Sequence, residues 1–354
     1  MLDLDWRPRL NTVTRNAWGL TFGDGVQAAE PTPSEQLHAG HHRDLHRYGP
    51  SPAPDTRPVL LVPPLAVPAN CYDLRPGQSL AAHLLGRGHT PYLVDYGAMT
   101  AADRGLGFEA WVDDIVPGAI RRVSEEHDGA DVDVVGWSLG GTLSLLTAAA
   151  HPDLPIRSVT AVGTPVDYTS IPAIAPLRAV GRITTERPLT AATWALGGLP
   201  AAVVQASYRV TAPRRELLRP WFIARNLHDT EAMARMQTVD RFMSAMPGYP
   251  ARFFHQVCSQ LILGNALATG ELRIGGRAVG LSGVSVPVLA VGSTTDVIAP
   301  AASARAITTA ATGAPSVRFE TTTGSHLGLI AGPDAAATTW AYLDDFLAEP
   351  ALVG

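Results

Sequence analysis

Three polar residues stand where the chain could assemble a covalent catalyst, and Ser138 is the first. It is the centre of Gly136-Trp137-Ser138-Leu139-Gly140, which follows an alternating run at 132–135 and precedes a helix-forming run at 141–150. A serine at such a strand-to-helix turn is held in a strained conformation that exposes its hydroxyl, and glycine two residues away on either side avoids a collision. Gly141 would also let the helix pack close to the sheet. The pattern predicts that Ser138 is a nucleophile.

A serine nucleophile needs a histidine that accepts its proton and a carboxylate that orients the histidine. With a serine at a strand-to-helix turn, the expected chain order is serine, acid, histidine, with the last two on loops after late strands. Of the four histidines after Ser138, only His326 falls between the last expected strand and the last helix. Asp296 follows the preceding strand and is the expected acid, while Asp167, after an earlier strand, is the alternative. Singly, Asp296 could merely start a helix and His326 could be a polar loop residue, but three residues at three suitable junctions favour a triad.

Backbone amides would have to stabilise the tetrahedral intermediate. One donor should be the amide of Leu139, and the other should come from the loop at 63–66. Because the two prolines that open this loop have no N–H, the second donor is Leu65 or, preferably, Ala66. We expect no cofactor and no bound metal.

Strand and helix patterns alternate in two separate parts of the chain. The first part has expected strands at 58–62, 91–95, 132–135 and 159–162 and helices at 78–86, 108–126 and 141–150, with Pro117 kinking or dividing the second helix. The second part has strands at 288–291 and 317–320 and helices at 301–311 and 334–347. This alternation predicts an α/β fold with a mainly parallel sheet and helices on both faces.

Residues 170–281 interrupt this alternation with an irregular helical pattern and no clear strands. We therefore expect a core at 57–169 and 282–354 with an inserted helical cap at 170–281. Residues 1–56 should be an N-terminal extension with an edge hairpin. Its four histidines lie at positions 38, 41, 42 and 46 with Asp44 among them, a set that fits a solvated strand face better than a metal cluster.

Composition excludes several classes of function. The chain has 354 residues, is 46% hydrophobic and carries a formal charge of -5 without a basic run, which argues against a nucleic-acid partner. It contains no lysine, so Schiff-base and P-loop lysine chemistry are excluded, and its two cysteines, Cys71 and Cys258, show no metal or redox spacing. The acidic N-terminus does not resemble a signal peptide, and the apolar stretch 189–206 is interrupted by glycine and proline. We expect a cytoplasmic protein without a membrane span.

With these residues in place, the chain resembles the polyhydroxyalkanoate synthase-related branch of the α/β hydrolases. The matching segments are Val62-Pro63-Pro64, Tyr72-Asp73-Leu74-Arg75-Pro76, Ser79-Leu80, Gly136 to Gly141, Thr164-Pro165-Val166-Asp167, Gly275-Gly276-Arg277, Asp296 and Gly324-Ser325-His326. The resemblance implies an α/β-hydrolase fold over most of 57–348, with Asp296 and His326 at the family's acid and base positions. Two departures are the serine at 138, where the synthases carry cysteine, and an N-terminal region much shorter than theirs. A serine ester is readily hydrolysed, so within this resemblance the serine favours a lipase-like or esterase-like activity.

Three functions remain open from the sequence. The first is a serine hydrolase acting on carboxylic esters with lipid-like or hydroxyacyl groups. The second is an acyltransferase or synthase that uses an acyl-CoA thioester and passes the acyl group to an alcohol, and the third is a hydrolase-like binding protein without turnover. The partner is expected to be a small acyl ester or thioester, and two copies could pair through the cap. Trp137 is expected to contact substrate. The aromatic residues of the cap could line an acyl pocket or form only the cap's own core, and they are Trp194, Trp221, Phe222, Phe242, Phe253 and Phe254.

Overall fold

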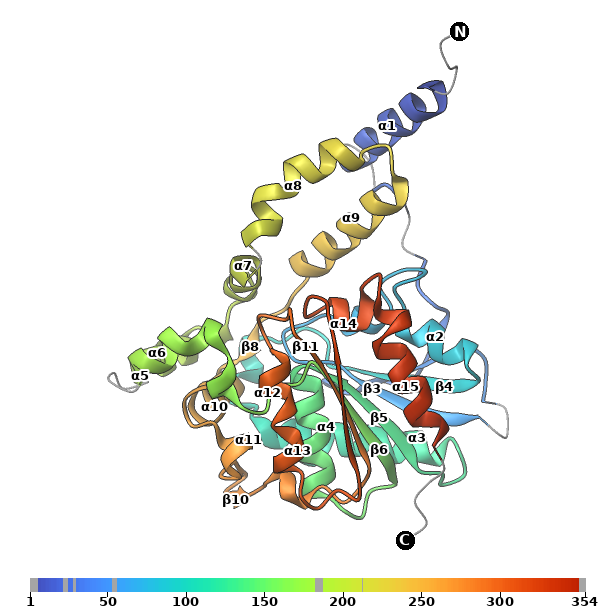
Figure 1. The fold of residues 1–354 in the computed structure, drawn as a ribbon. Helices are drawn as coiled ribbons and strands as arrows, with labels where there is room; N and C mark the ends of the chain where they lie inside the picture. Colours follow the sequence, from blue (N-terminus) through green and yellow to red (C-terminus); the bar gives the residue numbers. More distant parts are fainter. Residues whose placement is uncertain are drawn as a thin grey trace.

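An eight-stranded sheet forms the centre of the molecule (Figure 1). The computed structural model describes residues 6–21, 25–27, 30–52, 56–181, 187–211 and 213–349. The strand order is β1-β2-β4-β3-β5-β6-β11-β12, and the six strands from β4 to β12 are mutually parallel. Their bounds are β3 Arg57–Val62, β4 His89–Asp95, β5 Val132–Trp137, β6 Ile156–Val162, β11 Val288–Ser293 and β12 Val317–Thr322. The predicted α/β fold with a mainly parallel sheet is confirmed.

Both faces of the sheet are buried, because alternate residues of each strand enter two different cores. In β3, Leu60 and Val62 belong to one core, whereas Val59 and Leu61 belong to the other. Helices α3 (Val116–Glu125), α4 (Leu139–Ala150) and α13 (Ile307–Ala310) pack into the first core. Helices α2 (Leu80–Gly86), α14 (Gly328–Ala331) and α15 (Thr339–Ala348) pack into the second. Helix α12 (Ala301–Arg305) follows β11.

The predicted effect of Pro117 takes a specific form. A π-helical segment, Ala110–Ile115, precedes α3, and Pro117 lies in the first turn of α3. Proline cannot donate an N–H to the preceding turn, so the helix is divided at the position where a wider turn accommodates it.

An antiparallel hairpin extends one edge of the sheet. Strands β1 (Ser34–His38) and β2 (Asp44–Tyr48) form this hairpin, and β2 pairs antiparallel with β4. Before it lies helix α1 (Trp6–Thr21), which the sequence analysis did not predict. The Asn16 side chain in α1 donates to the carbonyl of Leu227, close before helix α9 (Thr230–Ser244), so the N-terminal helix is attached to the inserted segment.

The segment 170–281 is mainly helical, and its helices α8 and α9 project from the sheet in Figure 1. Its elements are α5 Ala175–Gly181, α6 Arg187–Ala195, α7 Ala201–Thr211, α8 Pro213–Asn226, α9 Thr230–Ser244, α10 Ala251–Gln256, a π-helical segment Val257–Leu263 and α11 Ala266–Thr269. Two-residue strands also occur, with β7 (Gly198–Leu199) paired to β8 (Tyr249–Pro250) and β9 (Arg273–Ile274) paired to β10 (Arg277–Ala278). They are too short to have left a strand pattern in the sequence.

Short 3-10 helices complete the described elements, at Ala69–Tyr72, Ala101–Gly105, Tyr168–Ser170, Pro172–Ile174, Leu281–Gly283 and Ala335–Ala337. Among the described residues, no helix has both the length and the apolar character needed to cross a bilayer. We propose the domain division expected from the sequence, with 1–56 as an extension, 57–169 and 282–354 as the core, and 170–281 as a cap.

Candidate active site

Ser138 occupies a strained turn between β5 and α4. Its backbone angles are φ 53° and ψ −124°, a conformation that L-residues rarely adopt and that costs on the order of 1–3 kcal/mol. The Ser138 amide donates to the carbonyl of Val162 in the neighbouring strand β6 over 2.8 Å. Strand β6 therefore holds the turn in place. The turn lies at the carboxyl end of β5.

The glycines around Ser138 are required by close approaches. A Cβ on Gly136 would lie 2.5 Å from the backbone of Gly141, and a Cβ on Gly140 would overlap the carbonyl oxygen of Val62. A Cβ on Gly141 would overlap the hydroxyl oxygen of Thr164. The helix start thus sits against β3 on one side and the end of β6 on the other.

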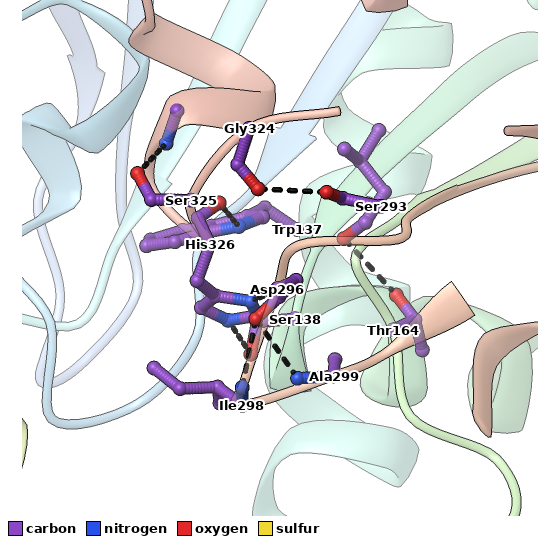
Figure 2. A network of polar contacts seen from close by, with 12 residues as sticks. Trp137, Ser138, Thr164, Ser293, Asp296, Ile298, Ala299, Gly324, Ser325 and His326 are labelled. Atoms are coloured by element: carbon purple, nitrogen blue, oxygen red, sulfur yellow. Dashed lines mark hydrogen bonds and ion pairs between the residues drawn. The ribbon is translucent and has the colours of Figure 1, made fainter. Parts of the chain in front are cut away.

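His326 and Asp296 meet Ser138 at the same edge of the sheet (Figure 2). The Ser138 Oγ is 2.8 Å from His326 Nε2, and His326 Nδ1 is 2.6 Å from Asp296 Oδ2. Both partners of the serine are buried, with His326 5% and Asp296 3% exposed. The three side chains therefore form a continuous chain of hydrogen bonds with the geometry of a Ser-His-Asp triad.

The environment of Asp296 favours its ionised form. Burial alone would raise the pKa of this carboxyl group. The hydrogen bond and charge of His326, together with the amides of Ala299 and Ile298, outweigh burial and leave the pKa below its ordinary value. These two amides donate to Oδ1 over 3.1 Å and 2.8 Å, so Oδ2 is kept for the histidine.

The loops that carry Asp296 and His326 are hydrogen-bonded to each other and to the turn that carries Ser138. The Ser293 hydroxyl donates to the carbonyl of Gly324 over 2.7 Å, and the Gly324 amide donates to Thr295 Oγ1 over 2.8 Å (Figure 2 shows the first contact). The Trp137 Nε1 donates to the carbonyl of His326 over 3.2 Å, and the two rings lie 5.0 Å apart. Trp137 is fully buried behind the histidine, where it positions the loop rather than lining a substrate pocket.

Two backbone amides are free to receive a developing oxyanion. In the described part of the chain, neither the Leu139 amide at the start of α4 nor the Ala66 amide donates to another group. Ala66 has φ 57°, a left-handed conformation that turns the backbone of the 63–66 loop. Leu65, the other predicted donor, precedes it in the same turn. We propose Leu139 and Ala66 as the two oxyanion donors, with Leu65 as the alternative to Ala66.

Comparisons with known proteins agree with this architecture. No family model matches the chain. The chain is 14% identical to mouse alpha/beta hydrolase domain-containing protein 10, with a TM-score of 0.51 over 89% of this chain and 98% of that chain. The esterase RhEst1 from Rhodococcus sp. ECU1013 gives a TM-score of 0.50 at 13% identity, covering 90% of this chain and 98% of that chain. These similarities show the fold.

Sequence comparison gives a narrower relationship. The chain is 23% identical over 341 residues to the poly(3-hydroxyalkanoate) polymerase subunit PhaC of Allochromatium vinosum, spanning 93% of this chain and 94% of that protein. The chain has the α/β-hydrolase fold and is similar in sequence to PhaC polymerase subunits. A 28% identical match over 305 residues to the PhaC subunit of Cupriavidus necator covers 83% of this PhaC-like chain but 50% of that protein.

Neither cysteine of this PhaC-like protein occupies the nucleophile position. Among the described residues neither Cys71 nor Cys258 forms a disulfide, and Cys71 is fully buried. Burial raises the pKa of the Cys71 thiol well above its ordinary value, which suppresses the reactive thiolate. Ser138 is the side chain within hydrogen-bond distance of His326 Nε2.

Asp167, the alternative acid, has hydrogen-bond partners away from the triad. Its carboxylate accepts from the amide and hydroxyl of Thr169, the hydroxyl of Ser170 and the side-chain amide of Asn265. The structure therefore gives Asp167 the role of a turn and helix cap and places Asp296 against the histidine.

The aromatic residues that the sequence places in the cap lie in different surroundings. Phe253 is buried in the core, with its ring in edge contact with Phe108 and Trp111, and Phe254 is half-buried near Tyr249. The exposed aromatic side chains of the cap are Trp194, Trp221 and Phe222. Of the predicted set, Phe242 lines a cavity.

That cavity has a volume of about 460 Å³ and begins at the proposed oxyanion loop. Leu65 and Ala66 line it from the core, the segment 95–99 after β4 lines it from the hairpin side, and Arg241 and Phe242 of α9 line it from the cap. The 95–99 segment and Arg241 were not predicted from the sequence as part of the site. The segment follows the carboxyl end of a parallel strand, where α/β proteins place their ligands, and this rule could have indicated it.

Tyr72 connects the two halves of the site, a role that the sequence did not reveal. Its hydroxyl donates to the carbonyl of Val62 over 2.9 Å and accepts from the amide of Trp137 over 2.8 Å. Val62 directly precedes the oxyanion loop, and Trp137 directly precedes the nucleophile. One buried hydroxyl thus fixes the ends of β3 and β5 relative to each other.

We predict that Tyr72→Phe lowers the free energy of unfolding by about 1–3 kcal/mol, because it leaves a buried N–H and a buried carbonyl unpaired. Activity should fall as well, since the hydroxyl that connects Val62, before the oxyanion loop, to Trp137, before Ser138, is lost. Urea unfolding followed by circular dichroism measures the first effect. Tyr96→Phe is the matched control, because among the described residues the buried Tyr96 hydroxyl has no hydrogen-bond partner, so its loss should cost little. Equal destabilisation by both variants would contradict the proposed link.

Proposed function

We propose that the protein is a serine hydrolase that cleaves carboxylic esters through an acyl-enzyme. The observation that carries the proposal is the short path from Ser138 Oγ through His326 to Asp296, at 2.8 Å and 2.6 Å. A hydroxyl so placed becomes a nucleophile when the histidine accepts its proton.

The reaction follows from the positions of these groups. Ser138 Oγ attacks the ester carbonyl carbon while its proton passes to His326 Nε2, and the carbonyl oxygen becomes an oxyanion facing the amides of Leu139 and Ala66. The intermediate collapses to an acyl-serine as His326 returns the proton to the leaving alkoxide, which departs as an alcohol. Water then attacks the acyl-serine with His326 as base, and the acid is released.

The substrate class follows from the cavity next to the oxyanion loop. Its volume of about 460 Å³ lies in the range of small-molecule sites, and most of its lining is apolar, including Leu65, Val67, Leu74 and Phe242. Asp95 and Arg241 add polar groups to the same walls. We propose a lipid-like or hydroxyacyl ester, whose chain fills the apolar part and whose oxygen atoms meet the polar groups.

Acyl transfer is the second candidate, and the similarity to PhaC polymerase subunits over 93% of the chain favours it. In this reaction an acyl-CoA thioester acylates Ser138, and the hydroxyl of an alcohol acceptor replaces water in the second step. The same triad serves both reactions, so access of water or acceptor to the acyl-serine decides between them. Pairing of two copies through the cap stays a prediction, and exposed residues such as Trp194, Leu217 and Trp221 are the surface that it would cover.

A fluorophosphonate probe tests the proposal. We expect the wild type to be labelled at Ser138 and Ser138→Ala to be unlabelled, with turnover reduced by at least about 10⁴-fold. Ser259→Ala is a matched control, because this serine of the cap donates to the carbonyl of His255 and should not affect labelling. Labelling that persists in Ser138→Ala would rule out this nucleophile.

A panel of acyl esters and acyl-CoA thioesters of increasing chain length separates the two reactions. Free acid as the product supports hydrolysis. Free coenzyme A together with an ester or polymer product, without free acid, supports transfer. A labelled protein that turns over no member of the panel would contradict both.

A further inference from the structure

The turn between β1 and β2 holds a pair of adjacent histidines that differ sharply in their surroundings. The predicted solvated strand face is wrong for His42, which is buried and lies in the turn, outside both strands. Its backbone has φ 59°, a left-handed conformation that is uncommon outside glycine. Such strain persists where the surroundings determine it, and often at sites with a function.

Both ring nitrogens of His42 face acceptors. Nδ1 is 2.5 Å from the carbonyl oxygen of Tyr96, which can only accept, so Nδ1 carries a proton. Nε2 lies 2.9 Å from Asp103 Oδ1, but the oxygen is not in hydrogen-bonding geometry, and among the described residues Nε2 has no hydrogen-bond partner. The His42 side chain is 5% exposed and that of Asp103 3%, so this nitrogen and the carboxylate face each other out of contact with solvent.

Asp103 is held so that one oxygen remains for this site. Its Oδ2 accepts from both the amide and the hydroxyl of Thr100, each over 2.7 Å. Its Oδ1 faces His42 and also lies 3.3 Å from Nε2 of His41. The neighbouring cation, Arg43, is paired with Asp114 and does not compensate Asp103.

His41 completes a set of three ligand atoms. Its side chain is 74% exposed, and its ring lies 3.8 Å from the ring of His42. The atoms available from His41, His42 and Asp103 all lie within 4.8 Å of one another. In a tetrahedral zinc site with bonds of about 2.0–2.1 Å, neighbouring ligand atoms are roughly 3.3 Å apart. This is close to the 2.9 Å and 3.3 Å that separate Asp103 Oδ1 from Nε2 of His42 and from Nε2 of His41. The exposed side at His41 leaves room for water as a fourth ligand.

We propose that His41, His42 and Asp103 bind a divalent transition metal, of which Zn²⁺ fits best. Two imidazoles, one carboxylate and a water are an N/O set that zinc accepts in four-coordinate geometry. The metal would lie between His42 Nε2 and Asp103 Oδ1, which face each other across 2.9 Å, and would bond to both. The hydrogen bond from His42 Nδ1 to the Tyr96 carbonyl fixes the tautomer that a metal ligand requires.

The site fastens the hairpin to a wall of the cavity. Residues 95–99 line the cavity, and the chain from Tyr96 to Asp103 is attached to the histidines at both of its ends. Bound metal therefore positions this wall and takes no part in the reaction at Ser138.

The test uses the untagged full chain, stripped with a chelator and dialysed, and titrated with ZnCl₂ in a calorimeter. We expect one equivalent to bind to the wild type and His41→Ala to weaken binding by at least about tenfold. Because His41 is largely exposed, its replacement should not impair folding. His46→Ala is the matched control, since this histidine of the same hairpin is outside the cluster and should bind zinc as the wild type does.

A second readout is independent of calorimetry. Zinc should raise the melting temperature of the wild type and of His46→Ala but not that of His41→Ala. Failure of the wild type to bind zinc would overturn the proposal and leave His42 and Asp103 as an ion pair of protonated imidazole and carboxylate. Equal zinc affinity in the wild type and His41→Ala would overturn it as well.

Discussion

Asp296→Asn should lower kcat by about 10⁴-fold while leaving the fold intact. The carboxylate accepts from His326 Nδ1 over 2.6 Å and thereby keeps the lone pair on Nε2, where Ser138 needs it. An asparagine amide can donate to Nδ1 and stabilise the opposite tautomer, in which Nε2 carries a proton and cannot accept one. Steady-state kinetics on an ester substrate measures the loss, and fluorophosphonate labelling should slow in parallel.

Asp167→Asn is the control for this prediction, because both acids were candidates from the sequence. Its carboxylate is occupied by Thr169, Ser170 and Asn265, so its replacement should change kcat by less than about tenfold. If Asp167→Asn had a lower kcat than Asp296→Asn, Asp167 rather than Asp296 would be the acid of the triad.

Gly140→Ala should also have a large effect, through the oxyanion loop rather than the triad. A Cβ at this position would overlap the Val62 carbonyl and lie 2.8 Å from the carbonyl carbon of Pro63. Either the start of α4 or the loop that carries Ala66 must move, so one amide donor leaves its place. Loss of one such donor typically reduces kcat by about 10²–10³-fold. Kinetics on the soluble variant measures this effect.

Gly118→Ala provides the matched substitution in another helix. Gly118 lies in α3, and a Cβ there would meet no atom within 4 Å. Since alanine favours a helix by up to about 1 kcal/mol over glycine, this variant should be as stable as the wild type or more so, with unchanged kcat. Full activity in Gly140→Ala would show that the contact between α4 and β3 is not needed for catalysis.

The predictions from sequence held where a local pattern determined the structure. The expected strands and helices of the core correspond to β3 to β6, β11, β12 and the helices between them. Ser138, Asp296 and His326 were selected because each follows a strand, and parallel strands bring their carboxyl ends to one edge. The residues that follow parallel strands lie at this edge because of the direction of the chain, and the alternation of strands and helices in the sequence already indicates parallel strands.

The features that the sequence did not reveal depend on contacts between distant segments. Nothing local to Tyr72 indicates that its hydroxyl reaches both Val62 and Trp137. The aromatic residues of the cap could equally line a pocket or pack among themselves, and their placement follows from helix orientations that periodicity does not define. His42 was assigned to a strand face because its partner, Asp103, lies 61 positions further along the chain.

The pairing of β6 with β11 brings together the two ends of the long inserted segment. The two strands are hydrogen-bonded neighbours, although about 125 residues separate the end of one from the start of the other. Closing a chain of that length costs only about 2 kcal/mol more entropy than closing one of roughly 15 residues, because the cost grows with the logarithm of length. Inserts of very different length at this junction therefore differ only modestly in the entropy of closing the chain, so the segment that covers the site can change while the sheet that carries Ser138, Asp296 and His326 stays the same.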